Sequence, residues 1–192
     1  MIEPLPADAR HAVVNSMATI EQLLLRQPEV EKPSYRLREL VPGDIGWIVH
    51  RHGTLYHEEY GWDERFEGLV AEIVAHFVKK RDPERERCWI AEHEGEVVGS
   101  VFCVRKTKSV AKLRLLYVEP SVRQMGIGTR LVDECIRFAR QAGYRTLTLW
   151  TQSVLGAARR VYERAGFRLV AEEPHHSFGF DLVAQTWKLD LR

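Results

Sequence analysis

The sequence is short of cysteine, of net charge and of long apolar runs. Its three cysteines, Cys88, Cys103 and Cys135, lie far apart and lack Cys-x-x-Cys spacing, so they predict neither a disulfide framework nor a thiolate metal site. We interpret them as buried apolar thiols. The formal net charge of +1 disfavours a nucleic-acid groove, because phosphate binding usually needs a basic excess. No apolar run approaches the roughly 20 residues that span a bilayer, and we expect no membrane partner.

The start of the chain also lacks the basic residues and apolar stretch of a signal peptide. We therefore expect a cytoplasmic protein. What the composition does contain is 45% hydrophobic and 29% charged residues, the balance of an ordinary globular protein rather than a disordered one. A length of 192 residues suits one domain with an appended segment.

The appended segment is residues 1–33, predicted to form a helix and a linker ahead of a main domain at residues 34–192. The helix is predicted by a heptad-like stripe of apolar residues: Val13, Met17, Ile20 and Leu24. Pro28 and the polar residues after it then break the pattern. The stripe could pair two subunits or cover the domain's own core, and we favour a homodimer.

The main domain shows strand and helix patterns in a fixed order: strand, two helices, three strands, helix, strand, helix and two strands. This order predicts a mixed α/β sheet and disfavours a strictly alternating Rossmann arrangement. The expected strands are 35–40, 88–92, 97–104, 112–118, 146–150, 167–170 and 185–189. The expected helices include one that opens at Asp63, one at 126–142 and one at 155–165. Residues 56–62 are expected to form an aromatic and acidic loop.

The chemistry is predicted at a turn where a strand ends at Pro120 and an amphipathic helix begins. Backbone N–H groups at a helix N-terminus bind phosphate without a charged side chain. Gly126 and Gly128 would let the anion approach the backbone, and Arg123 would add a cation. Two glycines before a helix can also form a simple tight connection.

Two motifs resemble those of GCN5-related N-acetyltransferases. Arg123-x-x-Gly126-x-Gly128, after a strand that ends Val118-x-Pro120, resembles the coenzyme A pyrophosphate loop of that family. Residues 158–167 resemble the family's A-x-x-L-Y-x-x-x-G-F segment, with Tyr162 at the tyrosine position. The resemblance covers residues 35–192 and implies a mixed, mostly antiparallel sheet flanked by helices. It also implies transfer of an acetyl group from acetyl-coenzyme A to an amine of a small molecule or protein.

The resemblance assigns roles to particular residues. Tyr162 would protonate the departing coenzyme A thiolate, although a half-buried tyrosine packing on Phe167 is the alternative. Leu155 stands where many members carry an asparagine that contacts the cofactor. The other expected cofactor-binding residues are Leu116, Tyr117 and Val118 for the acetyl and pantetheine groups, and Arg123, Gln124, Met125, Gly126, Ile127, Gly128 and Thr129 for the pyrophosphate.

The acceptor side has no motif, and Trp150 stands where some members keep a glutamate base. Glu58 and Glu59 are the first candidates for binding or deprotonating a cationic amine, with Tyr60 and Trp62 offering aromatic faces. A solvated loop is the alternative. His175 and His176 fall in a connection where this family often shapes its acceptor pocket, but an adjacent histidine pair is more often surface. No carboxylate at metal-ligand spacing supports zinc.

The leading segment allows a rival function. Residues 5–10 and 17–24 resemble the final helix of MarR-type repressors, which some bacterial proteins fuse to an acetyltransferase domain. No helix-turn-helix precedes them, so we expect no direct DNA binding by this chain. The rival is an acyl-coenzyme A sensing module without turnover, linked to such a regulator; Leu155 and Trp150 keep it open.

Overall fold

The computed structural model describes Val13, Ser16, Met17 and residues 34–191. Val13, Ser16 and Met17 are helical, and the first and last have exposed side chains. The rest of the predicted leading helix, including Ile20 and Leu24 of its apolar stripe, and most of the segment with the MarR-type resemblance lie outside the described residues. Among the helices that are described, none is both long and apolar enough to cross a membrane.

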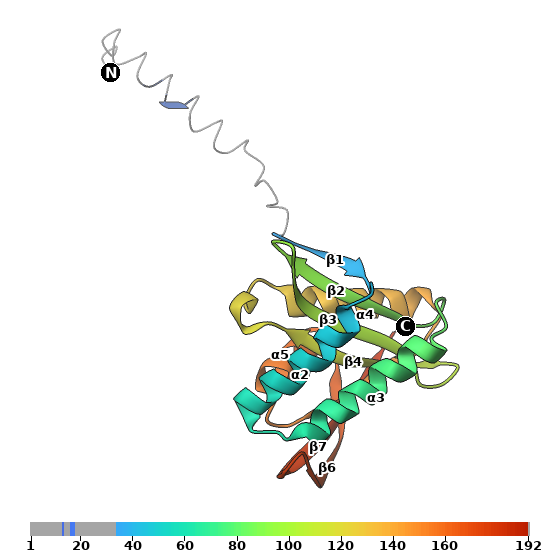
Figure 1. The fold of residues 1–192 in the computed structure, drawn as a ribbon. Coiled ribbons are helices and arrows are strands. Elements are labelled where there is room, and N and C mark those ends of the chain that lie inside the picture. Colours follow the sequence, from blue (N-terminus) through green and yellow to red (C-terminus); the bar gives the residue numbers. More distant parts are fainter. Residues whose placement is uncertain (1–12, 14–15, 18–33, 192) are drawn as a thin grey trace, which may run out of the picture. The chain divides into compact units, whose positions relative to one another are not determined.

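The domain is built on a seven-stranded sheet with the order β1-β2-β3-β4-β5-β7-β6 (Figure 1). Neighbouring strands are antiparallel except β4 and β5, which are parallel, so the mixed, mostly antiparallel sheet is confirmed. The strands are β1 (Tyr35–Glu39), β2 (Arg87–His93), β3 (Glu96–Arg105), β4 (Val110–Val118), β5 (Thr146–Gln152), β6 (Arg168–Ser177) and β7 (Phe180–Asp190).

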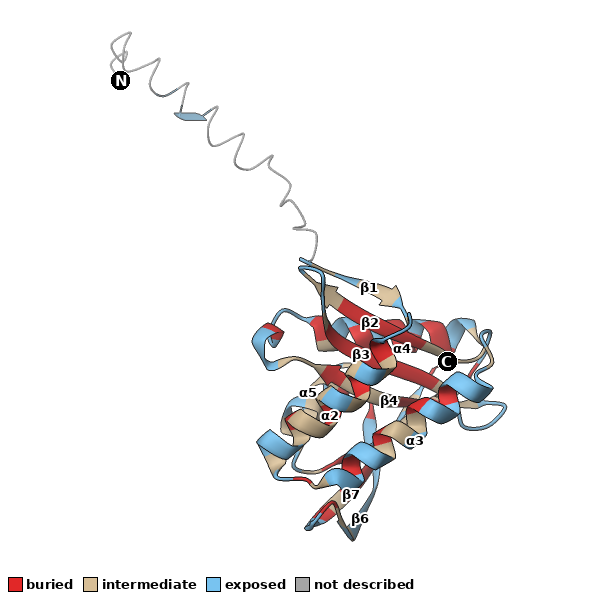
Figure 2. Ribbon diagram, viewed as in Figure 1, coloured by how far each residue is buried: buried red, intermediate tan, exposed pale blue. Residues whose placement is uncertain are grey.

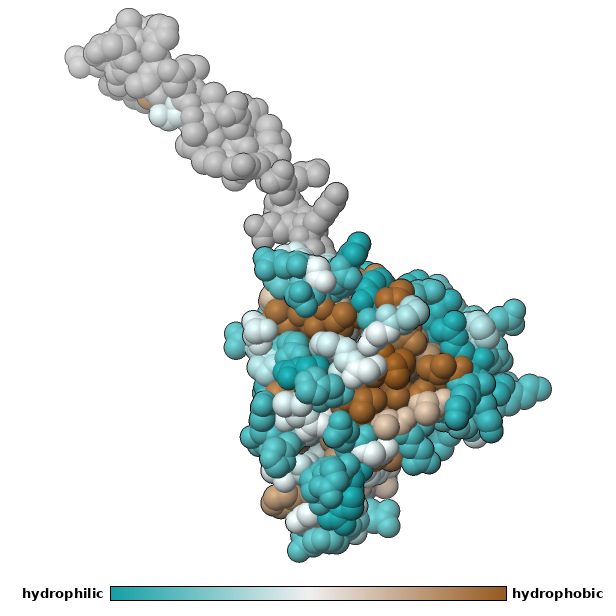
Figure 3. Space-filling view, viewed as in Figure 1, coloured by the Kyte–Doolittle hydropathy of each residue, from teal (hydrophilic) through white to brown (hydrophobic). Residues whose placement is uncertain are grey.

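Helices cover both faces of this sheet, α2 and α3 on one and α4 and α5 on the other (Figure 1). The helices are α2 (Asp44–Tyr60), α3 (Glu64–Lys80), α4 (Ile127–Gln141) and α5 (Gly156–Arg164), with a 3₁₀ turn at Pro120–Val122. Alternate residues of β2 point to opposite faces, so Ile90 packs in the α2/α3 core and Trp89 in the α4 core. The central strands are accordingly buried (Figure 2). On the α2/α3 face, apolar side chains reach the surface between the two helices (Figure 3).

Several local predictions are confirmed. Asp63 caps α3 by accepting a hydrogen bond from the backbone N–H of Arg65 at 3.1 Å. Glu94 and Gly95 both have positive φ and form the two-residue turn between β2 and β3. The three cysteines are buried and free.

The predicted loop at residues 56–62 is wrong, because α2 continues to Tyr60. The helix ends only at Gly61, which has φ 74° and whose N–H bonds to the carbonyls of Tyr56 and His57. His52, Tyr56 and Tyr60 recur at helical spacing. The helical period therefore continues through a stretch whose composition suggested a loop.

The expected connection that carries His175 and His176 is also wrong, because both residues lie in β6. The chain turns at Phe178 and Gly179, both with positive φ, into β7. β6 is the outer strand of the sheet, and an edge strand tolerates Pro174 and polar side chains that would not suit a central strand. The hairpin tip is held against the α2–α3 turn, where the N–H of Asp63 donates to the carbonyl of Phe178 at 3.2 Å.

Candidate active site

The site begins where β4 and β5 part. The two strands are paired only from Val110 to Leu113 of β4. Beyond that point β4 carries a bulge, with Leu115 at φ 49° and a register shift against β3. The β4 backbone from Arg114 to Val118 therefore has no β5 partner on that edge. An unpaired strand edge offers backbone donors and acceptors to an extended ligand.

A loop that exposes N–H groups follows β4. Gln124 and Gly126 have φ values of 77° and 78°, and Gly126 is the N-cap of α4. No side chain caps this helix, so its first N–H groups remain available for an anion. The predicted anion-binding geometry is thus formed by the backbone itself.

The loop and the free β4 edge enclose a cavity of about 520 Å³ together with α2 and α5, which we call the loop cavity. Met125 is the one predicted cofactor-binding residue that does not line it; its side chain is exposed. The structure brings the others together: Leu116, Tyr117, Val118, Arg123, Gln124, Gly126, Ile127, Gly128, Thr129 and Leu155.

The electrostatics of the loop cavity suit a polyanion. Arg123, Arg160 and Arg164 line it, against the single carboxylate of Glu59. Arg160 and Arg164 lie on α5 within the second motif, but no role was predicted for them. The cavity therefore fits coenzyme A, a long molecule that carries a pyrophosphate and a further phosphate on its ribose.

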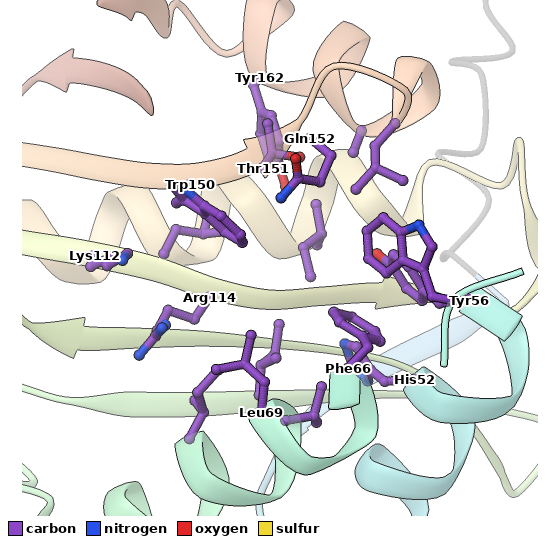
Figure 4. A pocket seen from close by; sticks show the side chains of 18 residues that line it. His52, Tyr56, Phe66, Leu69, Lys112, Arg114, Trp150, Thr151, Gln152 and Tyr162 are labelled. Atoms are coloured by element: carbon purple, nitrogen blue, oxygen red, sulfur yellow. The ribbon is translucent and has the colours of Figure 1, made fainter. Parts of the chain in front are cut away.

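A second, smaller pocket of about 100 Å³ lies between α2, α3 and the diverging β4 and β5 (Figure 4). We call it the aromatic pocket, because Tyr56, Trp62, Phe66, Trp150 and Tyr162 line it. The two cavities share four lining residues and so meet there: Tyr56, Leu116, Leu155 and Ala158.

Tyr162 projects from α5 into the aromatic pocket near this junction (Figure 4). Its side chain is buried, and its hydroxyl makes no hydrogen bond within the described part of the chain. Burial raises the pKa of Tyr162 well above its usual value, and nearby Tyr56 and Cys135 add to the effect. Its ring also packs against Phe167, with centroids 5.9 Å apart. The hydroxyl is therefore protonated at neutral pH and free to donate.

The predicted acidic and aromatic acceptor face does not form. Glu58 is exposed and lines neither cavity. Glu59 lines the loop cavity, where its carboxylate pairs with Arg123 at 2.7 Å. Tyr60 also lines the loop cavity, whereas Trp62 is buried in the aromatic pocket. Successive helical residues point about 100° apart, which separates Glu58, Glu59 and Tyr60, and Trp62 lies beyond the end of α2, so the four side chains do not converge on one ligand.

The histidine pair is likewise separated. His176 is exposed and bonded to Asp181 at 2.8 Å. His175 lies 3.0 Å from Oε1 of Gln152 and 2.9 Å from the hydroxyl of Ser177, and it lines neither cavity. Gln152 does line the aromatic pocket, and its buried amide nitrogen has no partner. His175 thus orients Gln152 rather than the acceptor.

Sequence reasoning missed the residues that line the rest of the aromatic pocket. Four of these residues carry basic or amide side chains: His52, Lys112, Arg114 and Gln152. Lys112 and Arg114 alternate with the buried residues Ala111 and Leu113, and this pattern was a readable signal that the two basic side chains share the other face of β4. The sequence around His52 gave no such signal, because the residues that surround His52 come from elements far apart in the chain.

His52 is a neutral histidine inside the core. It is 1% exposed, and Nδ1 lies 2.8 Å from the carbonyl oxygen of Ile48, to which it donates. Nε2 has no partner. Burial lowers the pKa of His52 from 6.5 to about 4.

Because the pKa of His52 is lowered in the folded protein, we expect the free energy of unfolding to decrease in acid. The unfolded chain takes up the proton near pH 6.5 and the folded chain near pH 4, so stability is full above pH 6.5 and falls between these values. We expect His52→Phe to remove a pH-dependent loss of roughly 2–3 kcal/mol in the free energy of unfolding over that range. Urea denaturation at half-unit pH steps measures this. His76→Gln, at an exposed position of α3, is the control; parallel pH curves for wild type and His52→Phe would contradict the prediction.

Comparison with known proteins agrees with this geometry. The acetyltransferase (GNAT) family model matches residues 45–167. A probable N-acetyltransferase camello from Xenopus tropicalis is 35% identical over 117 residues, which cover 59% of this chain and 52% of that protein. An uncharacterised N-acetyltransferase from Methanocaldococcus jannaschii is 32% identical, covering 70% of this chain and 61% of its own length. The chain thus spans about half to three fifths of these curated relatives.

A solved structure shares the fold. The putative acetyltransferase yncA from Salmonella typhimurium, determined with acetyl-coenzyme A, superposes with a TM-score of 0.66 at 20% identity and covers 83% of this chain and 95% of its own. The sheet that parts between β4 and β5, with a glycine-bearing loop opening α4, is therefore the GNAT fold. With a family model that matches most of the domain, the chain belongs to the GNAT acetyltransferase family.

Proposed function

We propose that the chain is an acetyl-coenzyme A-dependent N-acetyltransferase that transfers an acetyl group to an amine of a small molecule or protein. The observation that carries the proposal is the junction of the two cavities, where the free β4 edge and Tyr162 lie close together. One cavity suits the donor, and the other suits an acceptor.

Donor binding follows from the backbone. N–H groups at the start of α4 hold the pyrophosphate, with Arg123 adding charge. The unpaired edge of β4 pairs with the pantetheine amides and donates to the acetyl carbonyl oxygen, as an oxyanion hole does. Leu155 gives an apolar contact where an asparagine is common in the family. Acetyl-coenzyme A supplies the activated acetyl thioester.

Acetyl transfer needs a neutral amine, an acetyl carbonyl group that is fixed in position, and a proton for the departing sulfur. The amine nitrogen bonds to the acetyl carbon as the carbon–sulfur bond breaks, and Tyr162 donates its proton to the sulfur. The amine proton leaves through water and restores the Tyr162 hydroxyl. No carboxylate lines the aromatic pocket. Holding the amine beside the carbonyl is therefore the main contribution of the protein to rate.

The non-catalytic sensing module gains no support from the relatives, which are named N-acetyltransferases. The link to a MarR-type regulator, the homodimer and the cytoplasmic location stay predictions.

The proposed function is tested by thiol release. Purified protein is mixed with acetyl-coenzyme A and panels of amines and peptides, and free thiol is followed with a chromogenic reagent. We expect amine-dependent release, and calorimetry should detect acetyl-coenzyme A binding. If no heat accompanies the addition of acetyl-coenzyme A, the proposal fails.

Because Arg123 is paired with Glu59, we expect removal of the Glu59 charge to increase the affinity for acetyl-coenzyme A. Glu59 holds the guanidinium that the pyrophosphate needs, so Glu59→Gln should free it. Because partly exposed ion pairs are weak, we expect the acetyl-coenzyme A dissociation constant to fall only about two- to fivefold, as measured by calorimetry. Glu58→Gln, one residue earlier and outside both cavities, is the matched control. Weaker binding by Glu59→Gln would mean that the carboxylate positions Arg123 instead of competing for it.

A further inference from the structure

Two cations share one end of the aromatic pocket. Lys112 and Arg114 are two residues apart on β4, so their side chains leave the same face of the strand. Figure 4 shows both at the end beside Trp150, opposite Tyr56 and His52. Both residues are partly buried and line the pocket.

Neither cation has a partner in the described part of the chain. No ion pair or hydrogen bond joins the Lys112 ammonium or the Arg114 guanidinium to a described residue. None of the 18 residues that line the pocket is acidic. Glu72 of α3 acts on Arg114 electrostatically, but its side chain is exposed and outside the pocket. The pocket therefore holds two positive charges without an acidic side chain among its lining residues.

Two partly buried cations without a counter-charge in the pocket lower the stability of the folded protein. Burial, followed by the charges of Arg114 and Lys106, lowers the pKa of Lys112 to about 8, so its ammonium is still mostly charged at neutral pH. Burial likewise lowers the pKa of Arg114. Proteins rarely leave buried charges unpaired, because desolvation is repaid only by an opposite charge. A bound anion would supply that charge.

We propose that the acceptor is a small amine that carries a carboxylate, bound with its carboxylate on Lys112 and Arg114. This inference rests on the proposed function. The amine of the acceptor then lies at the junction of the two cavities, beside Tyr162 and Leu116. The acceptor lies along β4, between this junction and the two cations. Arg114 and Leu116 both line the pocket on either side of the bulge at Leu115, so the acceptor spans this irregular stretch of β4. The guanidinium fork matches a carboxylate with two parallel hydrogen bonds.

The neighbouring groups fit an amino acid of this kind. Gln152 presents an unpartnered amide nitrogen to the pocket, which can donate to a carboxylate or an acyl oxygen. Leu69, Ile73 and Phe66 give an apolar wall from α3. A cationic amine without a carboxylate would instead meet repulsion from both basic side chains.

The test uses matched acceptor pairs that differ by one carboxylate: phenylalanine with phenethylamine, tyrosine with tyramine, and 4-aminobutyrate with propylamine. Phosphoethanolamine is included to separate a phosphate from a carboxylate. Initial rates of thiol release from acetyl-coenzyme A give kcat/KM for each. We expect the acid of at least one pair to exceed its amine by about tenfold or more, through a lower KM. Equal or better use of the amine in every pair overturns the inference, as does a preference for phosphoethanolamine over every acid.

Variants connect any preference to the two cations. In Lys112→Met/Arg114→Gln the ratio of acid to amine should fall close to one. Lys79→Met, an exposed lysine of α3, should keep the wild-type ratio. The double variant removes unpaired charge from a partly buried site, so its Tm should equal or exceed that of wild type; a large drop would show that the cations have structural partners instead.

Binding of the acceptor can also be measured directly, without the acetyl-transfer reaction. Calorimetry of the same pairs, on wild-type protein saturated with coenzyme A, should show tighter binding of the acid. Failure of every acid to bind overturns the inference even if amines are acetylated, and the proposed function then stands. Failure of acetyl-coenzyme A to bind removes the proposed function itself.

Discussion

Replacing Tyr162 with phenylalanine is expected to lower kcat by about 100-fold while the dissociation constant of acetyl-coenzyme A stays within twofold. The hydroxyl is the one group of Tyr162 that the substitution removes, and it makes no hydrogen bond to a described residue that would be lost. The ring keeps its contact with Phe167. The loss therefore falls on proton donation to sulfur and not on packing or donor binding.

The measurement is steady-state thiol release at saturating acetyl-coenzyme A, with calorimetry for the donor. Tyr144→Phe is the matched control: this tyrosine donates to the carbonyl of Arg85 at 2.9 Å and lines neither cavity. It should cost stability without a specific fall in kcat. A decrease of less than about tenfold in Tyr162→Phe would assign the residue to packing and leave the proton donor unidentified.

The substitution Gly99→Ala is expected to destabilise the protein by about 2–3 kcal/mol and to weaken acetyl-coenzyme A binding by more than tenfold. A Cβ at this position would lie 2.8 Å from the carbonyl oxygen of Tyr117 and 3.4 Å from a methyl of Leu131. The oxygen belongs to β4, which pairs with β3 at this point, so it can move only if the strand moves. That movement would displace the free β4 edge on which donor binding depends.

Urea denaturation and calorimetry measure the two effects. Gly68→Ala is the control, because nothing lies within 4 Å of a Cβ there and the glycine sits inside α3. It should stabilise the protein by up to about 1 kcal/mol. Gly99→Ala with wild-type stability and affinity would show that β4 can shift without harm, and would weaken the assignment of its edge to the donor.

The parts of the fold that could be predicted are those with local causes. The period of α4 and the glycines before it are contained in one short stretch, and Glu94-Gly95 forms its turn from its own backbone preferences. The donor loop is continuous in sequence, so nearly all of its predicted residues line one cavity. A local motif therefore located one of the two cavities.

The aromatic pocket could not be predicted in the same way. The aromatic pocket joins α2, α3, β4, β5 and α5, so membership depends on how distant elements cross. Glu59 was proposed for the amine, but its partner Arg123 lies far along the chain and faces the other cavity. The length of β6 depends on pairing with β7 and not on its own polar sequence. Each error has a nonlocal cause.

The meeting of two cavities built from different elements has an evolutionary consequence. In the proposed function, the donor side depends largely on backbone atoms, which most substitutions leave in place, whereas the acceptor side depends on side chains of α2, α3, β4, β5 and α5. Under the proposed function, mutations in the aromatic pocket can change the preferred amine while binding of acetyl-coenzyme A in the loop cavity stays constant. Diversification of this kind needs no intermediate that loses the cofactor.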